Sequence, residues 1–314
     1  MSICDCTRNT GIGRPLVEND SLQSARISMS NPCSATATAA CVLLVHWMTG
    51  SAAAQSVASA KAPFSNPNKG RVVIEGGPAT PRHDAIYRAI LDGRDGKGPL
   101  CIIPTATVDP DSAVKAEIIA FGAHGWDTDV VGIPFTEAHP EYASDSTYVN
   151  AVKRCSGFFF TGGRQTRTTR VFRPDGGTTP ALEAIRTRVR EGAVVSGTSA
   201  GAAIMSDPML NAGTSMASFA RGMGSGGVSM LPGLGFFAGH LVDQHFFQVN
   251  RIGRLLVAVL RVDQYPVGFG IDRNTALVVE GNRAWVVGES GVLFVDGRNA
   301  QRATQGNGGG TASG

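Results

Sequence analysis

Residues 193–205 read Ala193-Val-Val-Ser-Gly-Thr-Ser-Ala-Gly-Ala-Ala-Ile-Met205. This stretch predicts a buried strand that turns sharply into a helix, because an apolar start is followed by small residues. The run from Gly197 to Gly201 matches the G-x-S-x-G pattern, in which such a turn exposes the serine hydroxyl. We therefore expect Ser199 to be a nucleophile and the N–H of Ala200 to bind an oxyanion, although small residues also crowd such turns for packing alone.

Strand-like and helix-like segments alternate before this turn. The expected strands are 71–75, 100–104, 130–133, 157–161 and 193–195, and the expected helices are 81–93, 111–123, 143–152 and 180–190. This alternation predicts an α/β three-layer sandwich, a mostly parallel sheet with helices on both faces. Ligands of such sheets bind outside the carboxyl ends of the strands, where Gly76-Gly77, Gly162-Gly163 and Ser199 all fall.

The second half of the chain is less regular. Residues 206–234 are rich in Gly, Ser and Met and predict a long loop near the nucleophile. A brief strand then leads to His245, and an amphipathic helix follows with Leu255 and Val259 on its apolar side. Further strands are expected at 267–271, 275–280, 283–287 and 291–295, the last three closing the domain as antiparallel strands.

A serine hydroxyl needs a base, and histidine is the usual one. Of the six histidines, His245 stands where a strand ends, beside Asp243 and Gln244. A histidine in such a polar cluster is equally a structural hydrogen-bond partner, so these residues alone leave its role open. The nearby Arg251 and Arg254 complete a polar group that fits either a pocket for a substrate carboxylate or the solvated start of a helix.

Residues 1–54 are predicted to be a leader outside the fold. An apolar core at 37–48 and a small-residue site, Ala52-Ala53-Ala54, before Gln55 follow the order of a secretory signal peptide. The alternative is a disordered Ala-rich leader, and translation from Met29 is a further option. We expect a linker at 55–70, a single α/β domain at 71–298 and a disordered Gly-rich tail at 299–314. A cleaved signal would make the mature protein periplasmic or extracellular.

Cysteine usage and charge exclude several classes of function. Four of the six cysteines fall in the leader, and Cys101 and Cys155 each begin an apolar strand, so we expect buried thiols rather than a disulfide. Because no P-loop, Rossmann glycine pattern or Cys/His cluster occurs, neither a metal nor a cofactor is expected. A net charge of +3 is too small to favour nucleic acid, and no apolar run predicts a membrane span in the mature chain.

Four ordered motifs resemble those of the cyanophycinases, serine peptidases related to the α-aspartyl dipeptidases. They are Phe160-Thr-Gly-Gly-Arg-Gln165, Gly197-Thr-Ser-Ala-Gly-Ala202, Asp243-Gln-His-Phe246 with Arg251-x-x-Arg254-Leu255, and Gly268-Phe-Gly-Ile-Asp272. The resemblance covers about residues 70–290. It implies a class I glutamine amidotransferase-like fold for a single peptidase domain, with Ser199 as the nucleophile and His245 as its base.

The resemblance also implies a substrate and the residues that bind it. Cyanophycinases hydrolyse cyanophycin, a poly-aspartate chain with an arginine joined to each side chain by an isopeptide bond, and release β-Asp-Arg dipeptides. Gly163 would add an oxyanion N–H to that of Ala200. The sequence leaves the oligomeric state open, a homodimer included. The positions implied for substrate binding are Gln165, Asp243, Gln244, Arg251 and Arg254.

Two departures from the family keep other functions open. The family places a triad acid between serine and histidine, but no Asp or Glu occurs between Pro208 and Val242. Asp207 and Asp272 remain as candidates for the third member, as does a non-carboxylate group. Arg273 stands where the family often has an acid, and it would repel a substrate guanidinium. The alternatives are therefore a peptidase for short Asp-containing or isoaspartyl peptides, or a non-catalytic binding relative.

Overall fold

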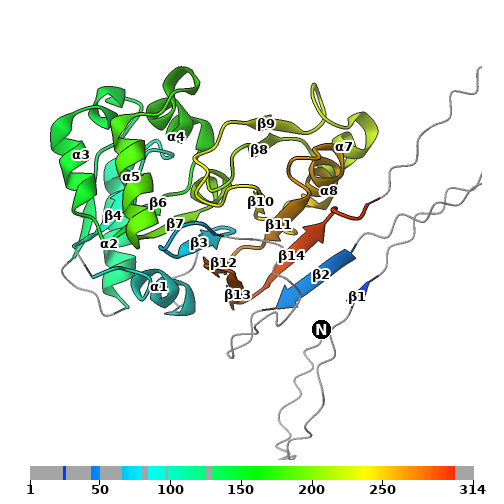
Figure 1. Ribbon diagram of the computed structural model, residues 1–314, viewed down its shortest axis with the longest axis horizontal. Helices are drawn as coiled ribbons and strands as arrows, with labels where there is room; N and C mark the ends of the chain where they lie inside the picture. Colours follow the sequence, from blue (N-terminus) through cyan, green and yellow to red (C-terminus); the bar gives the residue numbers. More distant parts are fainter. Residues whose placement is uncertain are drawn as a thin grey trace, which may run out of the picture.

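The computed structural model describes residues 66–78, 84–96, 98–124 and 129–300, with the backbone of two earlier strands, β1 (Ser24–Ala25) and β2 (Leu44–Thr49). Its largest element is a seven-stranded sheet of order β13-β12-β3-β7-β6-β4-β5 (Figure 1). Five neighbouring strands run parallel: β3 (Val72–Glu75), β4 (Leu100–Ile103), β5 (Val130–Gly132), β6 (Gly157–Phe160) and β7 (Val194–Thr198). Two antiparallel strands extend the sheet, β12 (Thr275–Glu280) and β13 (Arg283–Gly288). The predicted α/β fold with a mostly parallel sheet is confirmed.

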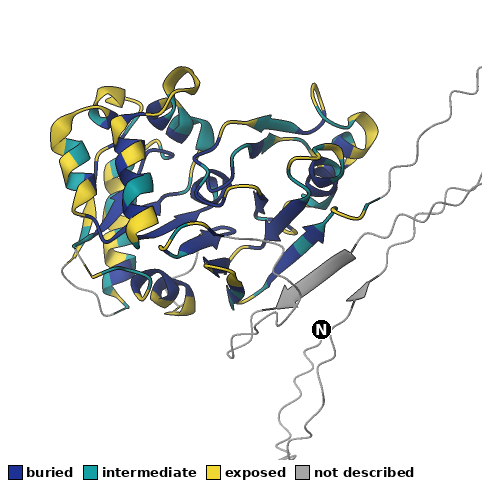
Figure 2. Cartoon of the chain, in the orientation of Figure 1, coloured by how far each residue is buried: buried dark blue, intermediate teal, exposed yellow. Residues whose placement is uncertain are grey.

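Helices cover both faces of this sheet, and the buried strands lie between them (Figure 2). One face carries α1 (Asp84–Leu91) and α2 (Pro110–Gly122). The other carries α3 (Ser146–Lys153), α4 (Gln165–Phe172) and α5 (Pro180–Glu191), with short 3-10 segments η1 (Pro140–Ala143) and η2 (Pro174–Gly176). Neighbouring residues of a strand point to opposite faces. Val73 therefore packs with Ile86 on one side of the sheet, while Ile74 joins Leu182 and Ile185 on the other.

A second sheet of five strands, in the order β1-β2-β14-β11-β10, lies beside the first. β10 (Leu241–Gln244) runs parallel to β11 (Val267–Ile271), and β14 (Gly291–Asp296) runs antiparallel to β11. The helix α8 (Ile252–Arg261) packs on this sheet through the predicted apolar side, including Leu255 and Val259. The sequence predicted that the strands at 275–280, 283–287 and 291–295 close the domain together. The first two pair as β12 and β13, but β14 belongs to the second sheet and pairs with β11.

The predicted leader, linker and tail fall mostly outside the described residues. The strand β2 overlaps the expected signal core and pairs antiparallel with β14. The last part of the expected linker is packed on the domain, because the N–H of Asn66 donates to Gly281 O at 3.0 Å and that of Gly70 donates to Val189 O at 3.0 Å. The signal peptide, its cleavage and the disordered tail stay predictions.

The expected loop at 206–234 contains regular structure, so this prediction was wrong in part. It holds a hairpin of β8 (Met209–Ala212) and β9 (Ser229–Leu231), and the helix α7 (Ser215–Arg221) lies between them. The side chain of Thr214 caps α7 by accepting a hydrogen bond from Ala217 N at 3.2 Å. Each element is short and partly exposed, which leaves little apolar periodicity to read in the sequence.

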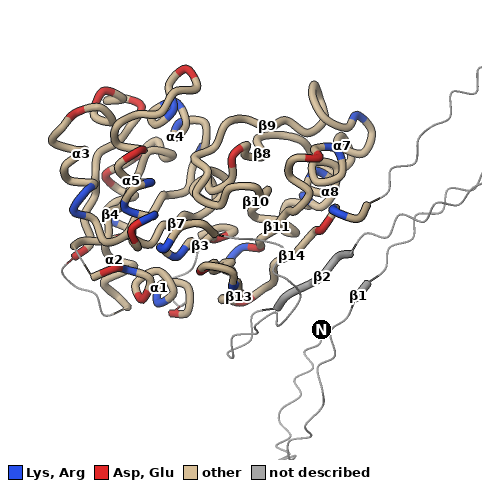
Figure 3. The backbone as a smooth tube through the Cα atoms, viewed as in Figure 1, with Lys and Arg blue, Asp and Glu red and all other residues tan. Residues whose placement is uncertain are grey.

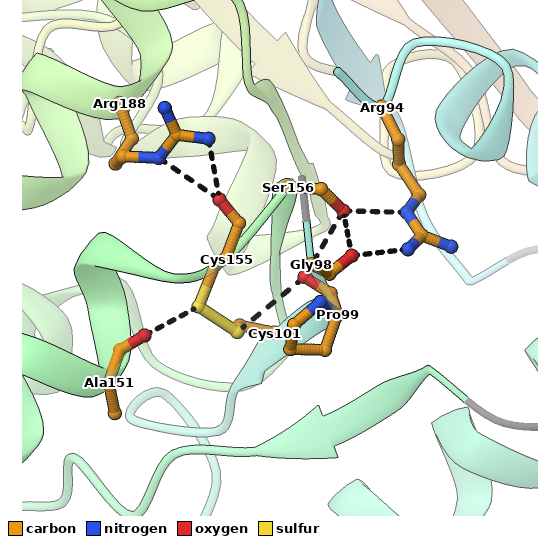
Figure 4. Close-up of a disulfide and its surroundings, with 8 residues drawn as sticks. All are labelled: Arg94, Gly98, Pro99, Cys101, Ala151, Cys155, Ser156 and Arg188. Atoms are coloured by element: carbon orange, nitrogen blue, oxygen red, sulfur yellow. Dashed lines mark hydrogen bonds between the residues drawn. A yellow bond between two sulfur atoms is a disulfide. The ribbon is translucent and has the colours of Figure 1, made fainter. Parts of the chain in front are cut away.

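Cys101 and Cys155 form a disulfide, which overturns the expectation of buried thiols (Figure 4). Cys101 lies in β4 and Cys155 stands two residues before the neighbouring β6. This pairing brings the two Cα atoms to 5.9 Å, within the range that a disulfide spans. The two residues are 54 positions apart, so the sequence alone did not show that they meet.

Charges of both signs are spread along the visible helices rather than gathered on one face (Figure 3). Within residues 66–300, as far as they are described, no helix is long and apolar enough to cross a membrane. The same part of the chain holds no group of three His, Cys, Asp or Glu residues that could bind a metal ion.

Candidate active site

Ser199 stands at the turn between β7 and the four-residue helix α6 (Ala200–Ala203). Its backbone has φ 53° and ψ −107°, an unfavourable conformation for a non-glycine residue that is typical of a nucleophile turn. The glycine of this motif allows close packing, because a Cβ on Gly201 would lie 2.2 Å from Phe160 O. The N–H of Ser199 donates to Glu75 O at 3.1 Å, which fixes the turn to β3.

His245 approaches Ser199 from the second sheet, directly after β10. Its Nε2 lies 2.7 Å from Ser199 Oγ. The ring rests on the Gly76-Gly77 turn at the end of β3: the N–H of His245 donates to Gly76 O at 2.5 Å, and a Cβ on Gly77 would lie 2.5 Å from the ring. The sequence placed this glycine pair at the carboxyl edge of the sheet without assigning it a role. The structure uses it as the surface on which the imidazole lies.

The other ring nitrogen of His245 contacts an arginine. His245 Nδ1 accepts a hydrogen bond from Arg273 Nε at 2.9 Å. Arg273 follows β11, and Gln244 pairs with Ile271 across β10 and β11, so the residues after both strands meet at one edge. From the sequence, Arg273 was expected only to repel a substrate guanidinium. The pairing of β10 with β11, which the sequence did not reveal, is the signal that would have placed it beside His245.

Neither carboxylate considered for a triad is hydrogen-bonded to His245 in the described part of the chain. Asp272 Oδ1 accepts from the N–H of Phe247 at 2.9 Å, and its Oδ2 accepts from Ser290 Oγ at 2.7 Å. This carboxylate therefore holds the turn that follows His245. Asp207 forms an ion pair with Arg173 at 2.6 Å and lines a separate cavity. The structure therefore shows neither Asp207 nor Asp272 as the third member of a triad.

His245 is held in its neutral form. Burial of the ring, together with the positive charges of Arg273 and Arg251, lowers the pKa of His245 to about 4. The ring therefore carries no charge at pH 7, as a base requires. Both charged groups that act on its pKa are cations, which disfavours the imidazolium that forms when the ring takes a proton.

The polar cluster after β10 is a mutually satisfied network. The fully buried carboxylate of Asp243 binds Arg254 through two contacts, at 2.6 Å to Nε and 2.5 Å to Nη2. Arg251 donates to Gln244 O at 2.7 Å and also to the Gln244 side chain. Asp243 and Arg254 thus fix the connection from β10 to α8. Both side chains are buried, whereas a substrate-binding role would require them to be exposed. Arg251 keeps a 23% exposed side chain.

The expected oxyanion donors lie around Ser199. Gly162 packs against it, since a Cβ there would lie 3.5 Å from Ser199 Cβ. In residues 66–300, as described, the backbone N–H groups of Gly163 and Ala200 donate no hydrogen bond to the protein. Gln165 is half-buried, and its Nε2 donates to Leu210 O at 3.0 Å, which ties α4 to β8. Two backbone donors thus remain for a developing oxyanion.

A serine–histidine pair at the carboxyl edge of a parallel sheet defines a serine-type hydrolase. Residues 75–287 match Peptidase family S51. The cyanophycinases of Trichormus variabilis and Nostoc sp. are each 35% identical over 236 residues, which are 73% of this chain and 74% of theirs. The chain belongs to peptidase family S51.

A solved structure supports the same fold. The crystal structure of a peptidase from an acI-B1 Actinobacterium covers 77% of this chain and 97% of its own, with a TM-score of 0.58 and 21% identity. This likeness concerns the fold alone, which is the glutamine amidotransferase-like fold that the family resemblance implied. The family match and the curated relatives identify the protein as a serine-type peptidase.

Proposed function

We propose that the chain is a secreted serine exopeptidase that hydrolyses cyanophycin to β-Asp-Arg dipeptides through an acyl-enzyme on Ser199. The contact of 2.7 Å between Ser199 Oγ and His245 Nε2 is the observation that carries the proposal. The choice of cyanophycin rests on the relatives, because the curated proteins that match over most of the chain are cyanophycinases.

The proposed reaction has two halves. His245 Nε2 takes the proton of Ser199 Oγ while Oγ attacks the scissile carbonyl, and the N–H groups of Ala200 and Gly163 stabilise the oxyanion. The imidazolium then gives its proton to the leaving amine, and an ester to Ser199 remains. Water, deprotonated by His245, hydrolyses the ester and restores the free hydroxyl.

Substrate recognition in this proposal uses the positive charge beside His245. Arg251 is partly exposed and Arg273 touches the ring, so a substrate carboxylate would find guanidinium groups close to the reacting serine. Guanidinium groups pair with carboxylates through two parallel hydrogen bonds. An exopeptidase must bind a chain end, and a terminal carboxylate fits this charge. The arginine side chains of cyanophycin would have to lie away from these two residues.

Two features support secretion. The leader has the order of a signal peptide, and the domain contains the disulfide between Cys101 and Cys155. Disulfides persist mainly in oxidising compartments such as the periplasm or the cell exterior. Intact mass measurement of the protein recovered from its native host tests this part of the proposal. Cleavage before Gln55 is expected, and an uncleaved cytoplasmic protein would contradict it.

The reaction itself is tested by incubating residues 55–314 with cyanophycin and measuring the products by mass spectrometry. The wild-type chain should release β-Asp-Arg, and the Ser199→Ala variant should not. If the chain hydrolyses short Asp-containing or isoaspartyl peptides but does not attack the polymer, its substrate is a short peptide and not cyanophycin. The matched control is Arg283→Ala on the exposed face of β13, which should cleave like the wild type.

One observation favours a second candidate, a non-catalytic binding relative. His245 Nδ1 faces Arg273 at 2.9 Å instead of a carboxylate, so the group that normally orients the base and stabilises its charged form is replaced by a cation. Binding of cyanophycin by the wild-type chain without any hydrolysis would establish this candidate and reject the peptidase reaction.

A further inference from the structure

The two hydrogen bonds of His245 determine where its proton lies. An arginine side chain only donates hydrogen bonds, so Arg273 Nε donates and His245 Nδ1 accepts, at 2.9 Å. A neutral imidazole carries one proton, which must then be on Nε2. The contact of 2.7 Å to Ser199 is consequently a bond in which Nε2–H donates to Oγ. A ring in this tautomer cannot take the serine proton, because the nitrogen that faces the serine is already protonated.

The charges around the ring oppose the next state as well. A ring that has taken a proton carries N–H groups on both nitrogens, and its Nδ1–H would point at the N–H of Arg273. Arg251 adds a second positive charge from the start of α8. The neighbouring carboxylates, Asp243 and Asp272, already accept hydrogen bonds from other groups. Proton transfer therefore requires the guanidinium of Arg273 to leave Nδ1.

The Arg273 side chain is placed so that it can leave. It is exposed, and in the described part of the chain the only hydrogen bond of its guanidinium is the one to His245. Its stem lies over the Gly76-Gly77 turn, where a Cβ on Gly77 would be 2.9 Å from Arg273 Cγ. The backbone is fixed separately, because the N–H of Arg273 donates to Gln248 Oε1 at 3.2 Å. The guanidinium can swing away while the turn stays in place.

We propose that Arg273 is a latch on His245 that a carboxylate of the substrate releases. The inference rests on the proposed reaction of Ser199 with His245. Two N–H groups of the guanidinium pair with the carboxylate, and the hydrogen bond from Arg273 to His245 Nδ1 is broken. Water then gives a proton to Nδ1 and another water takes the proton from Nε2, so the charge of the ring does not change. Nε2 is now bare and accepts the proton of Ser199 Oγ, which makes Arg273 a positioning residue that couples substrate binding to the base.

A small neutral serine reagent tests the latch without any peptide. Diisopropyl fluorophosphate has no carboxylate, so it should label Ser199 slowly in the wild-type chain at pH 7. Arg273→Ala should label at least about tenfold faster, a fraction of the 10²–10⁴-fold that a general base contributes. Arg283→Ala, an exposed arginine on β13, should label at the wild-type rate. A millimolar concentration of N-acetyl-aspartate should accelerate wild-type labelling and leave Arg273→Ala unchanged.

The position of the proton on the His245 ring gives a second test. If Arg273 had only a structural role, its removal would not move this proton. In ¹⁵N-histidine-labelled protein, nitrogen shifts distinguish a protonated from a bare ring nitrogen. Wild-type His245 should be bare at Nδ1 and protonated at Nε2. The Arg273→Ala variant should move the proton toward Nδ1. A wild-type ring protonated at Nδ1 at pH 7 would overturn the latch.

The outcomes separate the latch from the proposed function. If a folded Arg273→Ala variant is labelled faster than the wild type but no variant cleaves cyanophycin, the latch is supported and cyanophycin is rejected as the substrate. Labelling of Arg273→Ala at or below the wild-type rate, with an unchanged melting temperature, would reject the latch even where the wild type degrades cyanophycin. A Ser199 that reacts in no variant would reject both.

Discussion

Reduction of the Cys101–Cys155 disulfide should cost the mature domain much of its stability. The bond closes a loop of 54 residues. In the chain-entropy description, a cross-link over a loop of this length removes about 14 cal/mol/K from the unfolded chain, or about 4 kcal/mol at 25 °C. For a domain of this size the melting temperature should fall by about 8–16 °C. Most of this effect lies in the unfolded state, because the two strands stay paired in the folded sheet.

The assay is urea unfolding of residues 55–314, which contain only these two cysteines, followed by tryptophan fluorescence with and without dithiothreitol. The matched control is the double variant Cys101→Ala/Cys155→Ala, whose transition should not respond to the reductant. Thiol titration of the unfolded, unreduced wild type should detect no free cysteine. Equal midpoints for reduced and unreduced wild-type protein would refute the reasoning, as would two free thiols in the unreduced chain.

Three further predictions concern the site. Asp243→Asn should lower the free energy of unfolding by about 3–5 kcal/mol in calorimetry, because it leaves Arg254 buried without its counter-charge. Gly77→Ala should reduce kcat about 100-fold with little change in melting temperature, since the added methyl group would displace the His245 ring. The lowered pKa of His245 keeps the ring neutral down to about pH 4, so kcat/KM should fall only as the pH drops through that value. Removing one cation by Arg273→Ala should move this acid limb upward, toward the ordinary histidine pKa of about 6.5.

Each of these three has a clear contrary result. The control Glu183→Gln removes the partner of an exposed arginine on α5 and should lower the free energy of unfolding by less than about 1 kcal/mol. A loss for Asp243→Asn no larger than that of the control would contradict the buried network. An unchanged kcat in Gly77→Ala would show that the turn does not position the base. An acid limb that stays in place, or moves to lower pH, in Arg273→Ala would separate Arg273 from the pKa of His245.

Local patterns predicted the parts of the fold that local chemistry controls. The helix expected at 180–190 is α5, where the hydroxyl of Thr179 caps the first turn and Pro180 begins the helix. The alternation of strands and helices likewise gave the parallel sheet. The turn at Ser199 followed from its small residues, because Gly197 and Gly201 pack too closely for any side chain.

Two unpredicted contacts depend on which strands become neighbours. The disulfide exists because β4 pairs with β6, and the contact of Arg273 with His245 exists because β10 pairs with β11. Neither pairing has a sequence signal of its own. Asp243 differs for another reason: the family resemblance implied a substrate ligand, but Arg254 on α8 pairs with this carboxylate, which is fully buried.

The central claim is that Ser199 and His245 act as one chemical unit, and a double-mutant comparison tests it most directly. The rate of β-Asp-Arg release from cyanophycin would be measured for the wild type, Ser199→Ala, His245→Ala and the double variant. Each single substitution should lower the rate by about 10³-fold or more, and the double variant should lose no more than the worse single variant. A single variant that keeps the wild-type rate, or losses that multiply in the double variant, would contradict the account.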